Sequence, residues 1–353
     1  MAYVAVSGGA EAIEESIRLL EIYRSGTKKD LEIEAIEKKM SLLVDKVMSE
    51  AGLYSPTYAA LALKQCEGST EEAVFLLRAY RSTLKRNFYT NIADTRNMRV
   101  VRRISAAFKD IPGGQILGAT YDYTHRLMNF GIENEDPVEM NEKMQAFIDA
   151  QTPEEISPCM RVSDLLKEEG LMDSYEDNEK EPFDVTENLL EFPADRSAVL
   201  QTLTRSDTGY ISGLAYSVLR GFSAVHPTVG ELRSGYVELE IPYLDTEETM
   251  YIGEIILSEV ESFCPDEGKN ELKLGDGYGV VFGRNENKAI AMSILDYELE
   301  KGGAYPPNDQ EFVLMHGDCL EMNGFISHLK LPHYVTFQSK LDAVRKTRGE
   351  GHE

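Results

Sequence analysis

The sequence predicts an α+β fold of mixed α/β content, in which a helical N-terminal region is followed by a mixed domain of sheet and helices with an acidic insertion. Helically spaced apolar residues extend to about residue 90, strand-like apolar patterns lie in the second half, and acidic residues concentrate between the two. These observations divide the 353 residues into four segments: 1–95, mainly helical; 96–130, basic with glycines; 131–195, acidic and loosely ordered; and 196–353, mixed α/β with a C-terminal loop and helix.

The N-terminal segment carries both the periodicity and the start signals of helices. Apolar residues recur every three or four positions in 13–20 and in 36–47, which places them on one helical face. Ser55, directly before a proline, is typical of a helix N-terminus. Ser69 and Glu72 have the spacing of a capping box at the start of another helix. We therefore expect several short helices that pack on one another.

The acidic insertion stands out by its charge. Residues 131–195 contain 20 Asp and Glu against 4 Lys and Arg, so they account for −16 of the chain's net charge of −25. Five prolines are scattered through the segment. This composition favours a mobile insertion or a loosely packed arm, with short helices expected near 140–148 and 163–169.

The second half alternates strand and helix signals. Apolar and polar residues alternate over 236–241, as in a half-buried strand, and 277–283 is an apolar run bounded by glycines, as in a buried one. A helix is expected after Asn285. Further helices are expected over 309–322 and 335–346.

Composition excludes several classes of function. The net charge of −25 argues against binding to a nucleic-acid backbone. No apolar run approaches the roughly 18 residues of a membrane span, and no signal peptide is expected, so we expect a cytoplasmic protein without a membrane partner. The four cysteines are widely scattered, which excludes a disulfide scaffold and fits a reducing compartment.

A basic segment with glycines is the first motif that could carry chemistry. Phosphate-binding signatures of the P-loop and dinucleotide-binding types are absent. The pair Gly113 and Gly114 could let backbone N–H groups approach an anion, and guanidinium groups beside such a turn suit a polyphosphate or a phosphonate. A surface patch that binds the acidic insertion is the alternative. The basic residues of this segment are Arg99, Arg102, Arg103, Lys109, His125 and Arg126.

A second polar group precedes the 236–241 strand. Glu231 could face a positively charged sugar centre, with His226 as acid or base. The alternative is a solvated loop between a helix and the strand.

Two histidines five residues apart form the third motif. Pro332 favours an extended backbone at the preceding residue, so the rings of His328 and His333 could converge on a transition metal, with zinc as the default. Two ligands leave a tetrahedral site incomplete. Upstream His316 and Cys319 or a partner chain could add ligands, and a purely structural histidine pair is the alternative.

Long blocks of the chain resemble the PhnI family, a core subunit of the bacterial carbon–phosphorus lyase system. The resemblance covers nearly the whole chain and is weakest over 131–195. The blocks are AVFLLRAYRSTL, RRISAAFKDIPGGQILGATYDYTHRL, GLAYSVLRGF, HPTVGELRSGY, GYGVVFGRNENKAIAM and EFVLMHGDCLEMNGFISHLKLPHYVTFQ.

The resemblance implies a transferase activity in phosphonate catabolism. PhnI-like proteins act with PhnG, PhnH and PhnL to displace adenine from ATP by a phosphonate at the ribose anomeric carbon. The product is a ribose 1-phosphonate 5-triphosphate, and PhnI-like chains are associated with the nucleosidase-like part of this chemistry. Later steps prepare this product for carbon–phosphorus cleavage by PhnJ. In the core complex, two copies each of PhnG, PhnH, PhnI and PhnJ assemble.

The resemblance also implies roles for individual residues. The family's paired metal-binding histidines, near the PhnJ contact, correspond to His328 and His333. A carboxylate should stabilise the positive ribose, and Asp122, Glu231 and Asp110 stay open for it. The expected phosphate ligands, together with Mg²⁺ on ATP, are Arg102, Arg103, Lys109, Gly113, Gly114, His125 and Arg126. The competing hypothesis is a non-catalytic scaffold whose histidine pair holds an interface metal.

Overall fold

The computed structural model describes residues 9–26, 30–150, 160–175, 180–223, 226–243, 248–266 and 271–349. The chain forms two compact units, each assembled from separate stretches of sequence rather than from consecutive segments. The first contains residues 1–85, 181–215 and 301–353, and the second contains 86–180 and 216–300.

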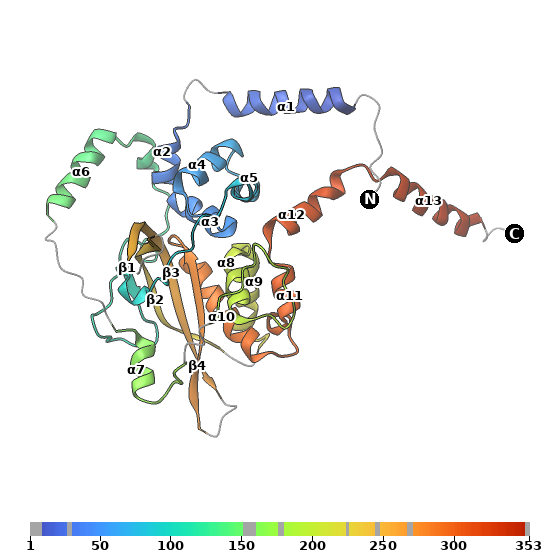
Figure 1. Ribbon diagram of the computed structural model, residues 1–353. Coiled ribbons are helices and arrows are strands. Elements are labelled where there is room, and N and C mark those ends of the chain that lie inside the picture. The colour runs from blue at the N-terminus through green and yellow to red at the C-terminus, as the bar shows by residue number, and fades with distance from the viewer. Residues whose placement is uncertain are drawn as a thin grey trace. The chain divides into compact units, whose positions relative to one another are not determined.

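The first unit is built from helices (Figure 1). One hydrophobic core of this unit lies among α3, α4 and α5, with a contribution from α2. By contrast, α1 buries none of its residues. The α-helices of this unit are α1 (Gly9–Ser25), α2 (Ile33–Lys39), α3 (Ser41–Ala51), α4 (Pro56–Gln65), α5 (Thr70–Thr83), α8 (Arg196–Arg205), α11 (Gln310–Met315), α12 (Cys319–Ser327) and α13 (Tyr334–Gly349). Helix α9 (Thr208–Leu219) crosses the boundary between the units. Two short 3₁₀ turns, η3 (Pro306–Asn308) and η4 (His328–Lys330), also belong to the first unit.

The helix starts predicted from capping residues are confirmed. The Ser55 hydroxyl accepts from the Tyr58 N–H at the start of α4, and the Ser69 hydroxyl accepts from the Glu72 N–H at the start of α5. Each bond satisfies a backbone donor that a helix N-terminus leaves without a partner.

One predicted helix is wrong. Residues 309–322 form two helices, α11 and α12, because a new N-cap interrupts them. The Asp318 carboxylate accepts from the N–H groups of Leu320 and Glu321. The Gly317 carbonyl in the break accepts from the Asp207 N–H, which holds the break against the end of α8.

The second unit contains one antiparallel sheet in the order β1-β2-β3-β4 (Figure 1). The strands are β1 (Arg99–Ile104), β2 (Thr228–Pro242), β3 (Thr249–Asp266) and β4 (Lys273–Phe282). The two strands predicted in the second half are found: 236–241 lies within β2, and β4 covers 277–282 of the predicted 277–283. The other elements are α6 (Pro137–Asp149), α7 (Val162–Glu168), α10 (Glu286–Lys301), η1 (Thr95–Asn97) and η2 (Phe130–Asn134).

Glycines in β4 let helix α10 lie directly on the sheet. A Cβ on Gly277 would stand 2.0 Å from the Ser293 carbonyl oxygen, and one on Gly279 would stand 2.1 Å from that of Ala289. Neither place can hold a side chain. Helix α10 begins just after Asn285, as predicted, and is followed by Gly302 with a positive φ of 65°.

Part of the acidic segment is anchored to this sheet. Val162, Leu166 and Met172 are buried and pack with Ile111 and Phe263 in a small core. Helix α6, in contrast, buries none of its residues. Residues 151–159 and 176–179 of this segment lie outside the described residues.

Over the described part of the chain, no helix has the length and apolar character needed to cross a membrane.

Candidate substrate site and histidine pair

The loop after β1 returns to the same strand and brings Asp122 to Arg102. Backbone bonds of 2.8 Å in both directions join Arg103 and Ile116. A Cβ on Gly118 would stand 2.8 Å from the Val101 carbonyl oxygen, so the chain can pass this close to β1 only without a side chain there. The glycine pair therefore lies in a loop between β1 and residue 116.

Arg102 is buried at the base of this loop and has a partner at each nitrogen. Its Nη2 lies 2.6 Å from Asp122 Oδ2 and its Nε lies 2.7 Å from Glu286 Oε1, while Nη1 donates to the Leu117 carbonyl. Burial raises the pKa of Glu286, and Arg102 opposes that shift. These contacts make Arg102 a support for Asp122, although among the described residues its Nε forms only an ion pair with Glu286 and no hydrogen bond.

The accessible basic residues of the loop are not the two buried arginines but three others. Lys109, His125 and Arg126 are exposed, and Arg126 Nη2 lies 3.7 Å from Asp122 Oδ1. Asp122 itself is 52% exposed. The structure thus places a half-exposed carboxylate between one buried and one exposed guanidinium group.

The glycine pair forms a tight turn. Gly113 and Gly114 have positive φ values of 79° and 73°, a conformation that glycine adopts without strain. The Gly114 N–H donates to the Ile111 carbonyl at 2.9 Å, so this donor is used within the turn.

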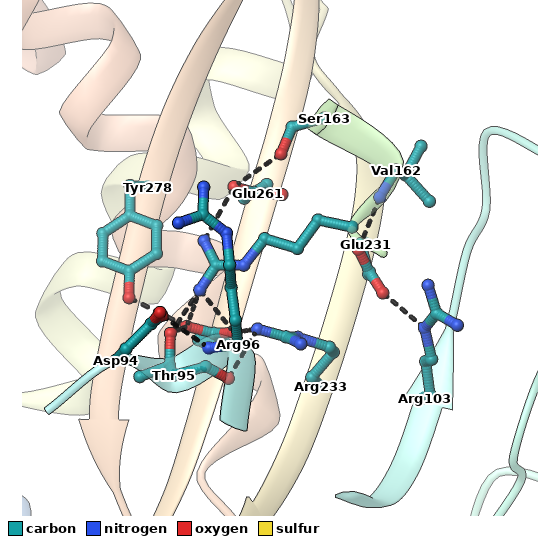
Figure 2. Close-up of polar contacts among 12 residues, drawn as sticks. Asp94, Thr95, Arg96, Arg103, Val162, Ser163, Glu231, Arg233, Glu261 and Tyr278 are labelled. Atoms are coloured by element: carbon teal, nitrogen blue, oxygen red, sulfur yellow. Dashed lines mark hydrogen bonds and ion pairs between the residues drawn. The ribbon is translucent and has the colours of Figure 1, made fainter. Parts of the chain in front are cut away.

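Arg103 and Glu231 form a fully buried ion pair (Figure 2). Their side chains are 1% and 2% exposed, and Arg103 Nε lies 2.5 Å from Glu231 Oε1. The other Glu231 oxygen accepts from the Val162 N–H at 2.9 Å. Arg103 also donates to the carbonyls of Pro112 and Met160. In this arrangement neither side chain is open to a ligand, and together they hold the start of α7 against β1 and β2.

A second buried group of charges lies beside this pair (Figure 2). Glu259 pairs with Arg233 and Arg161 and accepts from the Tyr278 hydroxyl at 2.9 Å. Glu261 pairs with Arg161 at 3.3 Å and accepts from the Ser163 hydroxyl at 3.0 Å, and burial raises its pKa. With Arg103 and Glu231 included, three arginines balance three glutamates. The balance explains how these charges are tolerated inside the unit.

His226 is exposed two residues before β2. Among the described residues, His226 forms no hydrogen bond with Asp122 or Glu231, because those carboxylates bond to arginines and to the Val162 N–H. Asp110 is likewise exposed, in the loop before the glycine pair.

The two histidines of the C-terminal loop come together as the sequence analysis expected. The ring centroids of His328 and His333 lie 5.4 Å apart, and both residues are partly buried. Each Nδ1 contacts a backbone carbonyl, that of Phe325 for His328 and that of Leu331, at 2.6 Å, for His333. A ring whose Nδ1–H donates to a carbonyl presents Nε2 as its ligand atom. The pair therefore fits a transition metal.

Within the described residues no group of three or more metal-ligating side chains occurs, so this pair alone would leave coordination open. Cys319 is a poor additional ligand because it is fully buried in the core of the first unit, and burial raises its pKa to about 12. A zinc ligand must be a thiolate. His316 points its Nδ1 at the Phe312 carbonyl on α11.

Comparison with known proteins decides the family. The family model described as "Bacterial phosphonate metabolism protein (PhnI)" matches residues 2–351. The chain belongs to the PhnI family. The relatives of this family include HtxH of Stutzerimonas stutzeri, named as a C-P lyase subunit protein, at 44% identity over 99% of this chain and 96% of the relative. Two others are named alpha-D-ribose 1-methylphosphonate 5-triphosphate synthase subunit PhnI: that of Escherichia coli (strain K12), 42% identical over 99% of both chains, and that of Rhizobium meliloti (strain 1021), 42% identical over 99% of this chain and 95% of the relative.

The resemblance to the PhnI family seen in the sequence is thereby confirmed, whereas the role of each residue rests on geometry. Sequence reasoning missed Glu286, the residue of this PhnI-family chain that pairs with Arg102. An acidic residue in the first turn of a helix is ordinarily explained by the helix dipole, so the sequence held no signal for this contact.

Proposed function

We propose that this protein acts in phosphonate catabolism and that, with partner subunits, it displaces adenine from ATP by a phosphonate at the ribose anomeric carbon. The product is a ribose 1-phosphonate 5-triphosphate, and the chain contributes the nucleosidase-like part of a transferase. The observation that supports this most is the 42% identity, over 99% of the chain, to two proteins named as subunits of such a synthase.

In this proposal Asp122 is the carboxylate that faces the reacting sugar. Cleavage of an N-glycosidic bond builds positive charge on the ribose, and a fixed carboxylate stabilises that charge. Asp122 is half exposed and is held by Arg102 at 2.6 Å, whereas Glu231 is enclosed with Arg103. The departing adenine needs a proton, and the exposed His226 is the proposed donor.

Exposed basic residues of the same loop are proposed to bind the anionic parts of the substrates. Lys109, His125 and Arg126 are accessible, and Arg126 adjoins Asp122. Arg102 and Arg103 support the loop from below through their buried pairs, and the Gly113–Gly114 turn shapes it. Mg²⁺ bound to the triphosphate neutralises the remaining charge.

The test measures adenine released from Mg²⁺-ATP by the chain assembled with its PhnG, PhnH and PhnL partners, in the presence of methylphosphonate. Asp122→Asn should reduce adenine release at least about 100-fold, the lower range for loss of a preorganised electrostatic group. Glu254→Gln is the matched control because Glu254 forms an exposed pair with Arg99 on the same sheet. Unchanged release by the Asp122 variant would remove Asp122 from the mechanism.

The histidine pair is proposed to hold zinc where this chain meets a partner such as PhnJ. His328 and His333 would supply two nitrogen ligands, and a partner or water would complete the coordination. A bound zinc supplies a Lewis acid or a structural link between subunits. We expect the double Ala variant to lack zinc in the purified complex while a His316→Ala control keeps it. Stoichiometric zinc in the double variant would refute the site.

The incomplete histidine pair also favours a second function, that of a non-catalytic scaffold with an interface metal. The two functions predict different effects of the Asp122 and histidine variants on adenine release and on assembly. A scaffold predicts that Asp122→Asn leaves adenine release intact and that loss of the histidines weakens assembly with two copies of each core partner. Size-exclusion chromatography with light scattering measures that assembly.

A further inference from the structure

Glu286 connects the start of helix α10 to the arginine that holds Asp122. Its Oε1 lies 2.7 Å from Arg102 Nε, and Nη2 of the same guanidinium group lies 2.6 Å from Asp122 Oδ2. Three side chains, from α10, from β1 and from the loop after β1, therefore form one series of charged contacts. Asp122, at 52%, is the most exposed of the three and lies at the end of the series.

The support that carries Glu286 is fixed to the sheet. Glu286 is the first residue of α10, and α10 lies directly on β4 because Gly277 and Gly279 have no side chains. The Asn285 side-chain amide donates to the Phe282 carbonyl at 2.8 Å, which ties the end of β4 to the start of the helix. A helix N-terminus also favours a negative charge. A carboxylate held in this way can fix the side chain that it contacts.

Arg102 depends on this carboxylate at one end of its guanidinium group. The Arg102 side chain is 6% exposed, and its Nη1 donates to the Leu117 carbonyl. Among the described residues, no hydrogen-bond acceptor serves its Nε, so the ion pair with Glu286 balances the charge at this end. Loss of Glu286 would leave the buried end without its counter-charge, and a movement of Arg102 would relieve the cost.

The sharing of one arginine also matters for the charge on Asp122. Because Glu286 draws on the same guanidinium charge, Asp122 keeps more of its own negative charge for a positive sugar. Arg102, Asp122 and the exposed Arg284 are the charged groups that act on Glu286. Burial raises the pKa of Glu286, the charge of Asp122 adds to this shift, and the two arginines oppose it.

We propose that Glu286 is a positioning residue for Asp122 in the displacement of adenine: it fixes Arg102, and Arg102 holds the Asp122 carboxylate toward the reacting sugar. This inference rests on the function proposed above. Glu286 acts through Arg102 and needs no contact with the substrate. Its effect is to preorganise the group that stabilises the developing charge.

Kinetics of adenine release by the assembled complex test the proposal. Glu286→Gln keeps the size of the side chain and removes its charge. It should lower kcat about 10- to 100-fold, since a misplacement of about 1 Å can cost 100-fold, and leave the KM for ATP unchanged. Glu254→Gln, in the exposed pair with Arg99, should match the wild type. A wild-type kcat for Glu286→Gln would overturn the inference.

A double variant tests whether Glu286 acts through Asp122. Residues that work as one unit give losses that do not multiply. Glu286→Gln combined with Asp122→Asn should therefore be no slower than Asp122→Asn alone. A double variant slowed by the product of the two single losses would contradict the positioning role.

The pH dependence of kcat separates positioning from a purely structural role. Glu286 must be ionised to pair with Arg102, and its pKa is raised by burial. The wild-type kcat should therefore decrease on acidification at a higher pH than an ordinary glutamate would cause. Glu286→Gln lacks this titration, so its acid limb should lie at lower pH. Acid limbs at the same pH in both enzymes would count against the proposal.

Hydrogen exchange tests the contact without relying on activity. Glu286→Ala removes it, so the amides of residues 116–126 should exchange faster than in the wild type, whereas Glu254→Ala should leave them unchanged. Unchanged exchange in Glu286→Ala would refute the positioning of the loop. Loss of adenine release in Asp122→Asn but not in Glu286→Gln would refute this inference alone. Wild-type release by Asp122→Asn would refute the proposed role of Asp122 and the positioning role with it.

Discussion

Replacement of Glu231 by Ala should strongly destabilise the second unit, because it leaves Arg103 as an unpaired charge inside the protein. The two side chains are 2% and 1% exposed, and they lie 2.5 Å apart. Removal of one partner of such a buried pair costs about 3–5 kcal/mol. The variant also deprives the Val162 N–H of its acceptor, so the start of α7 should detach from the sheet.

The same sheet offers a matched control. Arg99 and Glu254 form a pair of the same kind at 2.7 Å, but their side chains are 54% and 34% exposed. Loss of an exposed pair costs about 1 kcal/mol or less, so Glu254→Ala should unfold at nearly the wild-type urea concentration. The contrast between the two variants isolates burial as the cause.

Urea denaturation followed by circular dichroism measures both free energies, and hydrogen exchange at residues 160–175 reports on α7 directly. A loss below about 1 kcal/mol for Glu231→Ala would refute the reasoning. If that stable variant also released no adenine, Glu231 would replace Asp122 as the catalytic carboxylate.

Two further predictions concern packing and thiol chemistry. Gly279→Ala should destabilise the protein by about 3 kcal/mol or more, because the new Cβ would stand 2.1 Å from the backbone of α10. Gly213→Ala on helix α9 is the control, because its Cβ would have no neighbour within 4 Å. Thermal unfolding measures the Tm of both variants. Cys319, with a pKa raised to about 12 by burial, stays a thiol at pH 8 and should resist iodoacetamide in the folded chain. Half-buried Cys66 should react before Cys319, and mass spectrometry of the alkylated peptides measures the order of the two; faster alkylation of Cys319 would contradict the prediction.

Local interactions explain which features could be predicted from sequence. The hydroxyl groups of Ser55 and Ser69 bond to N–H groups three residues ahead, so the helix starts are encoded in neighbouring residues. Strand alternation in β2 and β4 is local in the same way. The break between α11 and α12 escaped prediction because the residues beside Asp318 keep helical spacing. Asp318 is itself a local N-cap, and the bond between Gly317 and Asp207 adds a long-range contact at the break.

In the candidate site, too, local features could be predicted from the sequence and long-range contacts could not. The sequence by itself determined that the 99–126 segment carries the cations and the glycine turn, and that Pro332 separates two histidines able to meet. Only the tertiary structure decided which arginines are accessible. Arg103 is buried with Glu231, 128 residues away in the sequence, and Arg102 is buried with Glu286, whereas Arg126 is exposed. Neighbouring arginines in a strand look alike in sequence, and the partners that desolvate and occupy them come from distant segments that only folding brings together.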